Sequence, residues 1–187
     1  MKKLLALIMA VLMTVTMFAG CGSTASGDDW SYISNKGEMI IGITYFEPMN
    51  YEDENGELTG FETEFAKAVC EKVGVTPKFQ KIDWDSKEVE LNAKTIDCIW
   101  NGLTITEERK QALAFTFPYL NNAQVLIVRN DSGIKTLADM KGKSVGIQSG
   151  SSAQDAVEGN AAFSSSLGEK VMFKDNITAL NDLDIGG

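Results

Sequence analysis

Short apolar runs alternate with helix-like patterns from residue 38 to the end of the chain. Runs of isoleucine, valine and aromatic residues favour strands, whereas apolar residues spaced three or four positions apart favour helices. The expected strands are residues 39–45, 77–83, 95–100, 123–129, 143–148 and 169–174. The expected helices are residues 61–73, 86–94, a stretch that begins near Thr106, a stretch from Gln154 onward, and residues 176–183. Strands that alternate with helices predict an α/β fold with a mostly parallel sheet.

One of these helices has clear signals along its length and at its end. Phe61, Phe65, Val69 and Val73 repeat at intervals of four, and Gly74 stands where a helix would stop. Glycine is the residue that most readily takes the left-handed conformation after a helix. The pattern therefore predicts a helix that ends just before Gly74.

Chemically distinctive residues follow the predicted strands. In parallel sheets, ligands bind where loops meet at the carboxyl ends of the strands. The residues at these places are Phe46, Glu47 and Pro48; Trp84; Asn101, Gly102, Thr104 and Thr106; and Gln148, Ser149, Gly150, Ser151 and Ser152. Aromatic rings, hydroxyl groups, a glycine turn and an arginine around one crevice suit a small zwitterion better than a sugar or a metal ion.

Arg109 stands in the first turn of the helix that begins near Thr106. Thr106 is a good N-cap, and Glu107 and Glu108 suit the positive end of the helix dipole. A cation in that turn is disfavoured by roughly 0.3–1 kcal/mol, which favours a role outside the helix. Because a guanidinium matches a carboxylate with two donors, we expect Arg109 and Thr104 to bind an α-carboxylate. The alternative is a solvated arginine offset by the two glutamates.

A glycine-serine turn offers a second anion site after the strand at 143–148. Gly150 permits a tight turn, and the backbone N–H groups of Ser151 and Ser152 would open a helix. The turn is not a P-loop, because no Gly-Lys-Ser/Thr follows at the required spacing. A serine that simply caps the helix is the alternative, and both interpretations stay open.

Aromatic and acidic residues near the first two strands also have two interpretations each. Trp84 and Phe46 either line a ligand site or cover the core. Glu47, beside Pro48, either accepts a hydrogen bond from an α-ammonium group or is an ordinary exposed carboxylate.

The first twenty residues have the pattern of an export signal. Lys2 and Lys3 precede an uncharged stretch that is short for a membrane-spanning helix. The stretch ends in Phe-Ala-Gly before Cys21, which resembles the lipobox of bacterial lipoproteins, in which the cysteine is lipidated. A signal peptide that is cleaved elsewhere is the alternative.

Composition narrows the possible partners and chemistry. The chain has 17 basic and 26 acidic residues and a formal net charge of −9, without a basic patch, so nucleic acid is not an expected partner. It has no histidine, which excludes His-based catalytic triads and His metal sites. We expect neither a cofactor nor a metal ion. Cys70 and Cys98 either form a disulfide, which export would permit, or are two separately buried thiols.

The chain resembles the family-3 extracellular solute-binding proteins of amino-acid ABC importers in three segments, GFETEFAKAVCEKVGV, NGLTITEERKQALAFTFPY and LADMKGKSVGIQSGSSAQDA. The Thr-x-Thr-x-x-Arg segment followed by Phe-x-x-Pro-Tyr is quite specific to that family. The resemblance runs from about Glu38 to the end of the chain. It implies a periplasmic-binding-protein-like type II fold, in which two α/β lobes joined by a hinge close on a ligand.

The resemblance also implies roles for particular residues. Arg109 and Thr104 match the pair that binds the α-carboxylate. The backbone carbonyl of Gly102 would accept a hydrogen bond from the α-ammonium group, and Asn101 would line the site. The other matches are Trp84 and Phe46 as aromatic walls and Gln148, Ser151 and Ser152 as contacts from the second lobe.

Two departures from the family pattern bear on these roles. The family usually has an aspartate after its first strand that meets the α-ammonium group, whereas this chain has Thr44 there, and Glu47 is the candidate substitute. The family also continues beyond the position of Gly187, through a further strand that carries another aspartate. We therefore expect a second lobe that is incomplete.

The resemblance gives an expected organisation and function. We expect a signal peptide at 1–20, a tether at 21–37 after the lipidated cysteine, a first lobe at 38–122, and a hinge strand with a partial second lobe at 123–187. The implied function is a monomeric binding protein, lipid-anchored to the outer face of the cell membrane, that captures a free polar or general L-amino acid for an ABC permease. The alternatives are a ligand-sensing domain and a cleft enzyme of the dehydratase or lytic type, for which Glu47 is the candidate acid.

Overall fold

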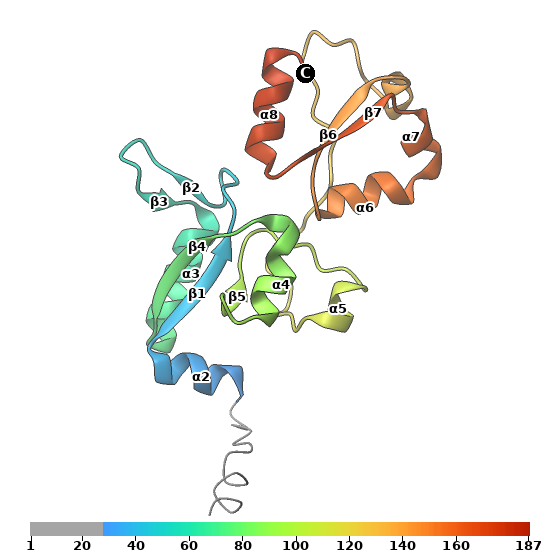
Figure 1. Ribbon diagram of the computed structural model, residues 1–187. Coiled ribbons are helices and arrows are strands. Elements are labelled where there is room, and N and C mark those ends of the chain that lie inside the picture. Colours follow the sequence, from blue (N-terminus) through green and yellow to red (C-terminus); the bar gives the residue numbers. More distant parts are fainter. Residues whose placement is uncertain (1–27) are drawn as a thin grey trace, which may run out of the picture. The chain divides into compact units, whose positions relative to one another are not determined.

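The computed structural model describes residues 28–187 (Figure 1). The signal peptide expected over residues 1–20 and the lipidation expected at Cys21 lie outside the described residues. Residues Ile33–Gly187 form one compact unit. Within the described range, no helix has both the length and the apolar character that crossing a bilayer requires.

Helix α2 (Asp29–Lys36) occupies the end of the range 21–37, where we expected a flexible tether. The tether prediction is therefore wrong from the first residue of α2 onward. The reason is that Ile33 is buried, at 7% exposed, and that Lys36 pairs with Asp97 at 2.7 Å. Asp97 also accepts a 2.6 Å hydrogen bond from a backbone N–H of the first strand, so one carboxylate ties the helix to the sheet.

The first sheet has three parallel strands in the order β4–β1–β5, namely β1 (Glu38–Ile43), β4 (Thr76–Lys81) and β5 (Cys98–Ile99). β1 and β4 pair along their whole length, from Glu38 opposite Thr76 to Ile43 opposite Lys81. This arrangement confirms the parallel α/β class predicted from the sequence. β5 is shorter than the strand expected over 95–100.

Helix α3 (Phe61–Val73) connects β1 to β4 and has the bounds that the sequence predicts. Gly74 caps it in the left-handed conformation, at φ 79°. The buried face carries Ala66 and Cys70, both 0% exposed, whereas Phe61 and Phe65 are 49% and 36% exposed. The repeat of large apolar residues thus predicts the helix but does not mark the face that meets the sheet.

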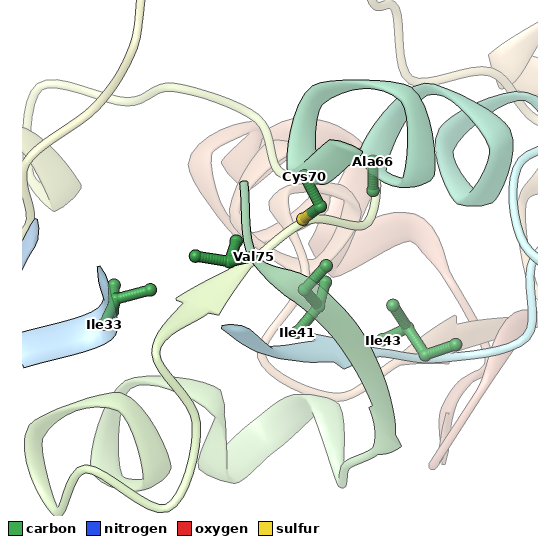
Figure 2. Packing of buried hydrophobic residues seen from close by; sticks show 6 residues of the cluster. All are labelled: Ile33, Ile41, Ile43, Ala66, Cys70 and Val75. Atoms are coloured by element: carbon green, nitrogen blue, oxygen red, sulfur yellow. The ribbon is translucent and has the colours of Figure 1, made fainter. Parts of the chain in front are cut away.

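The core of this part of the chain is small and built from several elements. Figure 2 shows its buried residues, which come from α2, β1, α3 and the residue before β4. They are Ile33, Ile41, Ile43, Ala66, Cys70 and Val75. Burial of such side chains, at roughly 25 cal/mol per Å² of apolar surface, holds the strand ends in place for the site described below.

Short elements fill the connections of the first sheet. A two-stranded antiparallel hairpin, β2 (Tyr51–Glu52) and β3 (Leu58–Thr59), follows β1. The 3₁₀ turn η1 (Trp84–Ser86) and helix α4 (Lys87–Asn92) follow β4. Helix α5 (Arg109–Ala112) follows β5 and has four residues. The Thr106 hydroxyl accepts a 3.2 Å hydrogen bond from the backbone N–H of Arg109. The helix itself begins at Arg109 with Glu108 at the N-cap position, so the expected start near Thr106 is three residues too early.

The second sheet is a parallel pair, β6 (Ser144–Gln148) and β7 (Glu169–Phe173). The turn η2 (Leu137–Met140) precedes it, helices α6 (Ser152–Gly159) and α7 (Ala161–Ser166) connect its strands, and α8 (Asn176–Ile185) follows. Met140, Val145 and Ile147 form a second buried cluster. β6, β7 and α8 agree with the sequence-based prediction. The helical stretch expected from Gln154 onward is two helices that start at Ser152, and η2 was not predicted.

Residues 123–129 are not a strand, which corrects the expected hinge strand. Among the described residues no strand pairs with this segment, and without a partner its backbone groups have no ladder to join. Val125 and Ile127 are 76% and 55% exposed. The residues of the segment favour a strand, but the segment does not become one because no neighbouring strand pairs with it.

Cys70 is a buried free thiol and Cys98 a partly buried one, so of the two interpretations the structure supports separate thiols. Burial raises the pKa of Cys70. Burial also raises the pKa of Cys98, to about 12, with smaller effects from Cys70 and the charge of Asp97. Since the thiolate is the reactive form, both cysteines should be inert in the folded chain.

We expect iodoacetamide at pH 8 to label Cys70 and Cys98 more than about 100-fold faster in urea-unfolded chain than in folded chain. Mass spectrometry of the digested protein measures each site separately. Equal rates in the two states would contradict the burial of the thiols. Failure to label the unfolded chain without reductant would instead indicate a disulfide.

Candidate ligand-binding site

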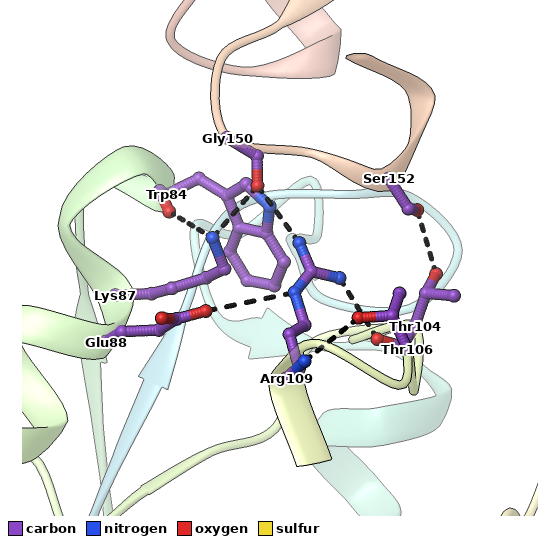
Figure 3. Close-up of polar contacts among 8 residues, drawn as sticks. All are labelled: Trp84, Lys87, Glu88, Thr104, Thr106, Arg109, Gly150 and Ser152. Atoms are coloured by element: carbon purple, nitrogen blue, oxygen red, sulfur yellow. Dashed lines mark hydrogen bonds and ion pairs between the residues drawn. The ribbon is translucent and has the colours of Figure 1, made fainter. Parts of the chain in front are cut away.

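Several of the predicted site residues lie at the ends of parallel strands, where the sequence-based rule places them. Trp84 follows β4, Asn101 lies two residues after β5, and Gln148 ends β6. Their side chains are buried, with exposed fractions of 6%, 5% and 6%. Figure 3 shows how polar groups from residues 87–88, 104–109 and 150–152 meet beside Trp84.

Arg109 lies at the centre of these contacts and is 8% exposed. Its guanidinium donates to the carbonyl oxygens of Thr104 at 3.0 Å and Gly150 at 3.2 Å (Figure 3). Its Nε lies 3.8 Å from a carboxylate oxygen of Glu88, which is 40% exposed. The arginine is thus not solvated, and the interpretation in which Glu107 and Glu108 merely offset it is wrong. Two neutral carbonyls hold a group that is built to bind an anion.

Hydroxyl and amide groups continue the polar surface beside the arginine. The hydroxyl oxygens of Thr104 and Ser152 lie 3.0 Å apart (Figure 3). Asn122 donates to the Thr104 hydroxyl at 2.6 Å, and Gln124 donates to the Ser152 hydroxyl at 2.9 Å. The structure therefore brings together Thr104, Arg109 and Ser152.

Lys87 is a site residue that the sequence reasoning missed. It is 3% exposed, and its ammonium group donates to the carbonyls of Gly150 at 2.9 Å and Trp84 at 3.1 Å (Figure 3). It also lies 5.1 Å from the centroid of the Trp84 ring. Lys87 is the first residue of α4, where a cation opposes the helix dipole. The signal that singled out Arg109 was therefore present at Lys87 too.

Asn101 does not present its side chain to a ligand. Its amide nitrogen donates to the backbone carbonyl of Thr44 at 2.8 Å, and its oxygen accepts from the Thr44 hydroxyl at 2.7 Å. Both residues are buried, at 5% exposed each. Asn101 thus fixes the loop after β1 to the loop after β5, and the Thr44 hydroxyl is already bonded.

Glu62 is a second buried group that the sequence reasoning missed. The carboxylate is 1% exposed and accepts from Gly102 N–H at 2.8 Å, Tyr119 O–H at 2.5 Å and Asn50 Nδ2 at 3.1 Å. Burial raises the pKa of Tyr119, and the hydrogen bond to Glu62 raises it further, so the phenol stays protonated as the donor. The carboxylate holds Gly102, whose φ of 55° suits glycine. Its position four and eight residues before buried Ala66 and Cys70 is the signal that would have found it.

Phe46 and Glu47 are exposed. The Phe46 ring packs close to Gly102. A Cβ atom placed on Gly102 in ideal geometry would lie 3.7 Å from the nearest ring atom. The ring thus stands beside the glycine whose carbonyl was expected to accept from an α-ammonium group. Glu47 precedes Pro48 through a cis peptide bond.

The turn after β6 uses much of its hydrogen-bonding capacity internally. The Ser151 hydroxyl accepts from Gln154 N–H at 3.3 Å and caps α6, as the simpler interpretation of the turn holds. Gly150 N–H donates to the Gln154 side chain at 3.0 Å. Gln148 donates to the Lys174 carbonyl at 3.4 Å. The outward-facing groups of this turn are the Gly150 carbonyl and the Ser152 hydroxyl, both of which contact residues of α5 or its preceding loop.

The arrangement suits the binding of a small carboxylate-bearing molecule. It has two buried cations, a pair of hydroxyls and an adjoining indole ring, which together match a charged head group. No group of three potential metal ligands occurs among residues 28–187. Parallel α/β sheets with polar residues at their strand ends are the architecture of periplasmic amino-acid-binding proteins, and the fold is of this type II class.

Comparisons with known proteins identify the family. The model for "bacterial extracellular solute-binding proteins, family 3" matches residues 39–184, and the chain belongs to this family. The match covers both parallel sheets and the loops that carry the polar cluster.

Three similar proteins illustrate the relationship. The arginine-binding extracellular protein ArtP of Bacillus subtilis (strain 168) is 37% identical over 152 residues, which cover 81% of this chain and 57% of the relative. The L-cystine-binding protein TcyJ of Escherichia coli (strain K12) is 30% identical over 181 residues, which cover 94% of this chain and 66% of the relative. A solved structure is also similar, that of an ABC uptake transporter substrate-binding protein from Streptococcus pneumoniae with bound histidine. Its TM-score is 0.81 and its identity 40%, and the match covers 86% of this chain and 67% of that one.

The chain thus spans 57% and 66% of the lengths of these two curated relatives. The printed names of these relatives give arginine, cystine and histidine as their ligands, and these amino acids differ in side-chain charge. Family membership therefore fixes a class of ligand for the relatives without selecting one amino acid.

Proposed function

We propose that this chain is the ligand-binding component of an ABC importer and captures a free polar or general L-amino acid for delivery to a membrane permease. The observation that carries the proposal is Arg109, a buried guanidinium that donates to two neutral carbonyl oxygens. A buried cation is stabilised far better by an anion than by carbonyl dipoles. Glu88 lies 3.8 Å from the arginine Nε and is 40% exposed, so it is a weak partner. The α-carboxylate of an amino acid is the proposed anion for the two guanidinium donors that face the carbonyls.

The hydroxyl groups beside Arg109 are the proposed neighbours of the same carboxylate. Thr104 and Ser152 are 3.0 Å apart, so one ligand oxygen can accept from either hydroxyl. The Gly102 carbonyl is the proposed acceptor for the α-ammonium group, with Glu47 as a further acceptor. Phe46 and Trp84 are the proposed aromatic walls, and Asn101, Gln148 and Ser151 support the loops around the ligand.

A binding role is preferred to a cleft enzyme. General acid–base catalysis requires a group poised beside the substrate, and the candidate acid, Glu47, is exposed. The relatives described above are named as binding proteins, which supports the same preference at the level of the family. A ligand-sensing domain would use the same site, and the binding experiment below applies equally to it.

Export and lipid anchoring belong to the same proposal. The relative ArtP is named as extracellular, and the family is described as extracellular. The first twenty residues have the pattern of an export signal and precede Cys21, the proposed lipid attachment point. The protein would then act as a monomer at the outer face of the cell membrane.

We expect at least one L-amino acid to bind the chain saturably and to raise its melting temperature. A ligand at 100 times its Kd raises the free energy of unfolding by about 2.7 kcal/mol. Differential scanning fluorimetry with the twenty L-amino acids, followed by titration calorimetry of each hit, measures this effect. The D-enantiomer and the carboxamide of each hit serve as controls. A chain that melts at one temperature with every amino acid would contradict the proposal.

A further inference from the structure

Within the described part of the chain, Lys87 is a buried cation that forms no ion pair. At 3% exposed it is buried more deeply than Arg109, and no carboxylate lies within ion-pair distance of its ammonium group among residues 28–187. Its acceptors are the Trp84 and Gly150 carbonyls. Burying an ammonium group without an anionic partner is strongly unfavourable, so the position calls for an explanation.

Lys87 and Arg109 point at the same atom. The Lys87 ammonium donates to the Gly150 carbonyl oxygen at 2.9 Å, and Arg109 donates to that oxygen at 3.2 Å (Figure 3). Two cations that converge on one oxygen define the place where a negative charge is most stabilised. In this structure a neutral carbonyl occupies that place.

The electrostatic surroundings of Lys87 agree with this geometry. Burial lowers the pKa of Lys87, and the positive charge of Arg109 lowers it further. The carboxylates of Glu88, Asp85 and Asp155 act in the opposite direction but less strongly. An added carboxylate between the two cations would therefore relieve both the burial cost and the repulsion.

Gly150 allows this convergence because it has no side chain. Its φ is +65°, and an ideal Cβ would lie 2.8 Å from an Asp85 oxygen and 3.5 Å from the Lys87 ammonium nitrogen. The glycine brings its carbonyl to both cations without obstruction. An incoming carboxylate oxygen can replace this carbonyl, because it would accept the same two hydrogen bonds and add a negative charge between the cations.

We propose that Lys87 is a second cationic ligand of the α-carboxylate, so that the carboxylate binds between Lys87 and Arg109 in place of the Gly150 carbonyl. This inference rests on the proposed function. It predicts that the chain recognises the carboxylate with two charges, and that the contribution of Lys87 does not depend on the amino-acid side chain.

The test compares Lys87→Gln with Lys110→Gln, which removes the same charge from an exposed lysine on α5 that pairs with Glu107. Affinities for L-glutamine, L-glutamate and L-arginine are measured by titration calorimetry. Lys87→Gln should weaken all three by a similar factor of about 10–100, and Lys110→Gln should leave them within about threefold. Loss confined to L-glutamate would overturn the proposal, because Lys87 would then address the ligand side chain. Unchanged affinity in Lys87→Gln would overturn it as well.

A second measurement separates direct contact from a purely structural role. The ¹⁵N signal of the Lys87 ammonium group should shift on addition of L-glutamine and not on addition of L-glutaminamide at the same concentration. Weakened binding in Lys87→Gln without such a shift would mean that the lysine only holds the loop at Gly150, and the proposal would fail. If no amino acid binds the unmodified chain, the proposed function itself fails, which is a different result from binding that ignores Lys87.

Discussion

Arg109→Ala is expected to weaken amino-acid binding by about 2–5 kcal/mol, which is the usual cost of truncating one partner of a buried, hydrogen-bonded charge pair. The loss should be similar for every amino acid that binds, because the guanidinium addresses the carboxylate that they share. Titration calorimetry on the chain and its variant measures the change. Because Arg109 also donates to the Thr104 and Gly150 carbonyls, we expect the variant to melt at a lower temperature as well.

Two control variants make the Arg109 experiment specific. Arg129→Ala removes an exposed arginine that pairs with Asp131, and it should leave binding unchanged. Arg109→Lys keeps the charge but loses the flat two-pronged donor face, so its affinity should fall between those of the unmodified chain and the alanine variant. An Arg109→Ala chain that still binds amino acids with unchanged affinity would exclude the proposed carboxylate site.

Glu62→Ala is expected to destabilise the chain by about 3–5 kcal/mol, since it leaves buried donors without an acceptor and opens a cavity. The donors are Gly102 N–H, the Tyr119 hydroxyl and the Asn50 amide, all within 3.1 Å of the carboxylate. Urea unfolding followed by tryptophan fluorescence measures the free energy of unfolding. We expect the substitution to lower stability directly, and to weaken ligand binding because it shifts Gly102.

The matched control for Glu62 lies two residues along the same helix. Glu64 is 57% exposed in its side chain and pairs with Lys67 at 2.7 Å, so Glu64→Gln should change the unfolding free energy little. Glu62→Gln keeps the shape of the side chain and should cost less than Glu62→Ala. If Glu62→Ala and Glu64→Gln unfold at the same urea concentration, the hydrogen-bond network around Glu62 contributes nothing to stability.

The elements of regular structure were largely predictable from the sequence. The parallel strands and helix α3 follow from apolar runs and from Gly74 as a stop signal, which are local properties of the chain. The segment 123–129 shows where local reasoning ends. Its composition favours a strand, but a strand exists only with a partner, and partners are set by the tertiary structure.

The candidate site was predictable in part, for a physical reason that differs between residues. Arg109 was found because a cation in the first turn of a helix conflicts with the dipole. Lys87 stands at the start of α4 in the same conflict, yet it lies beside acidic residues and resembles an ordinary surface lysine in the sequence. Ser151 was ambiguous because the residue that caps a helix and the residue that binds an anion have the same chemistry.

The hydrogen bonds of Glu62 also constrain the order in which the chain can fold. Its partners Gly102 and Tyr119 are 40 and 57 residues away along the chain, so both bonds require large loops to close first. Helix α3 can form from local interactions, but its carboxylate finds these partners only after β5 has joined the sheet. We therefore expect the geometry around Gly102 to form late in folding, with the long-range contacts rather than with the helix that carries Glu62.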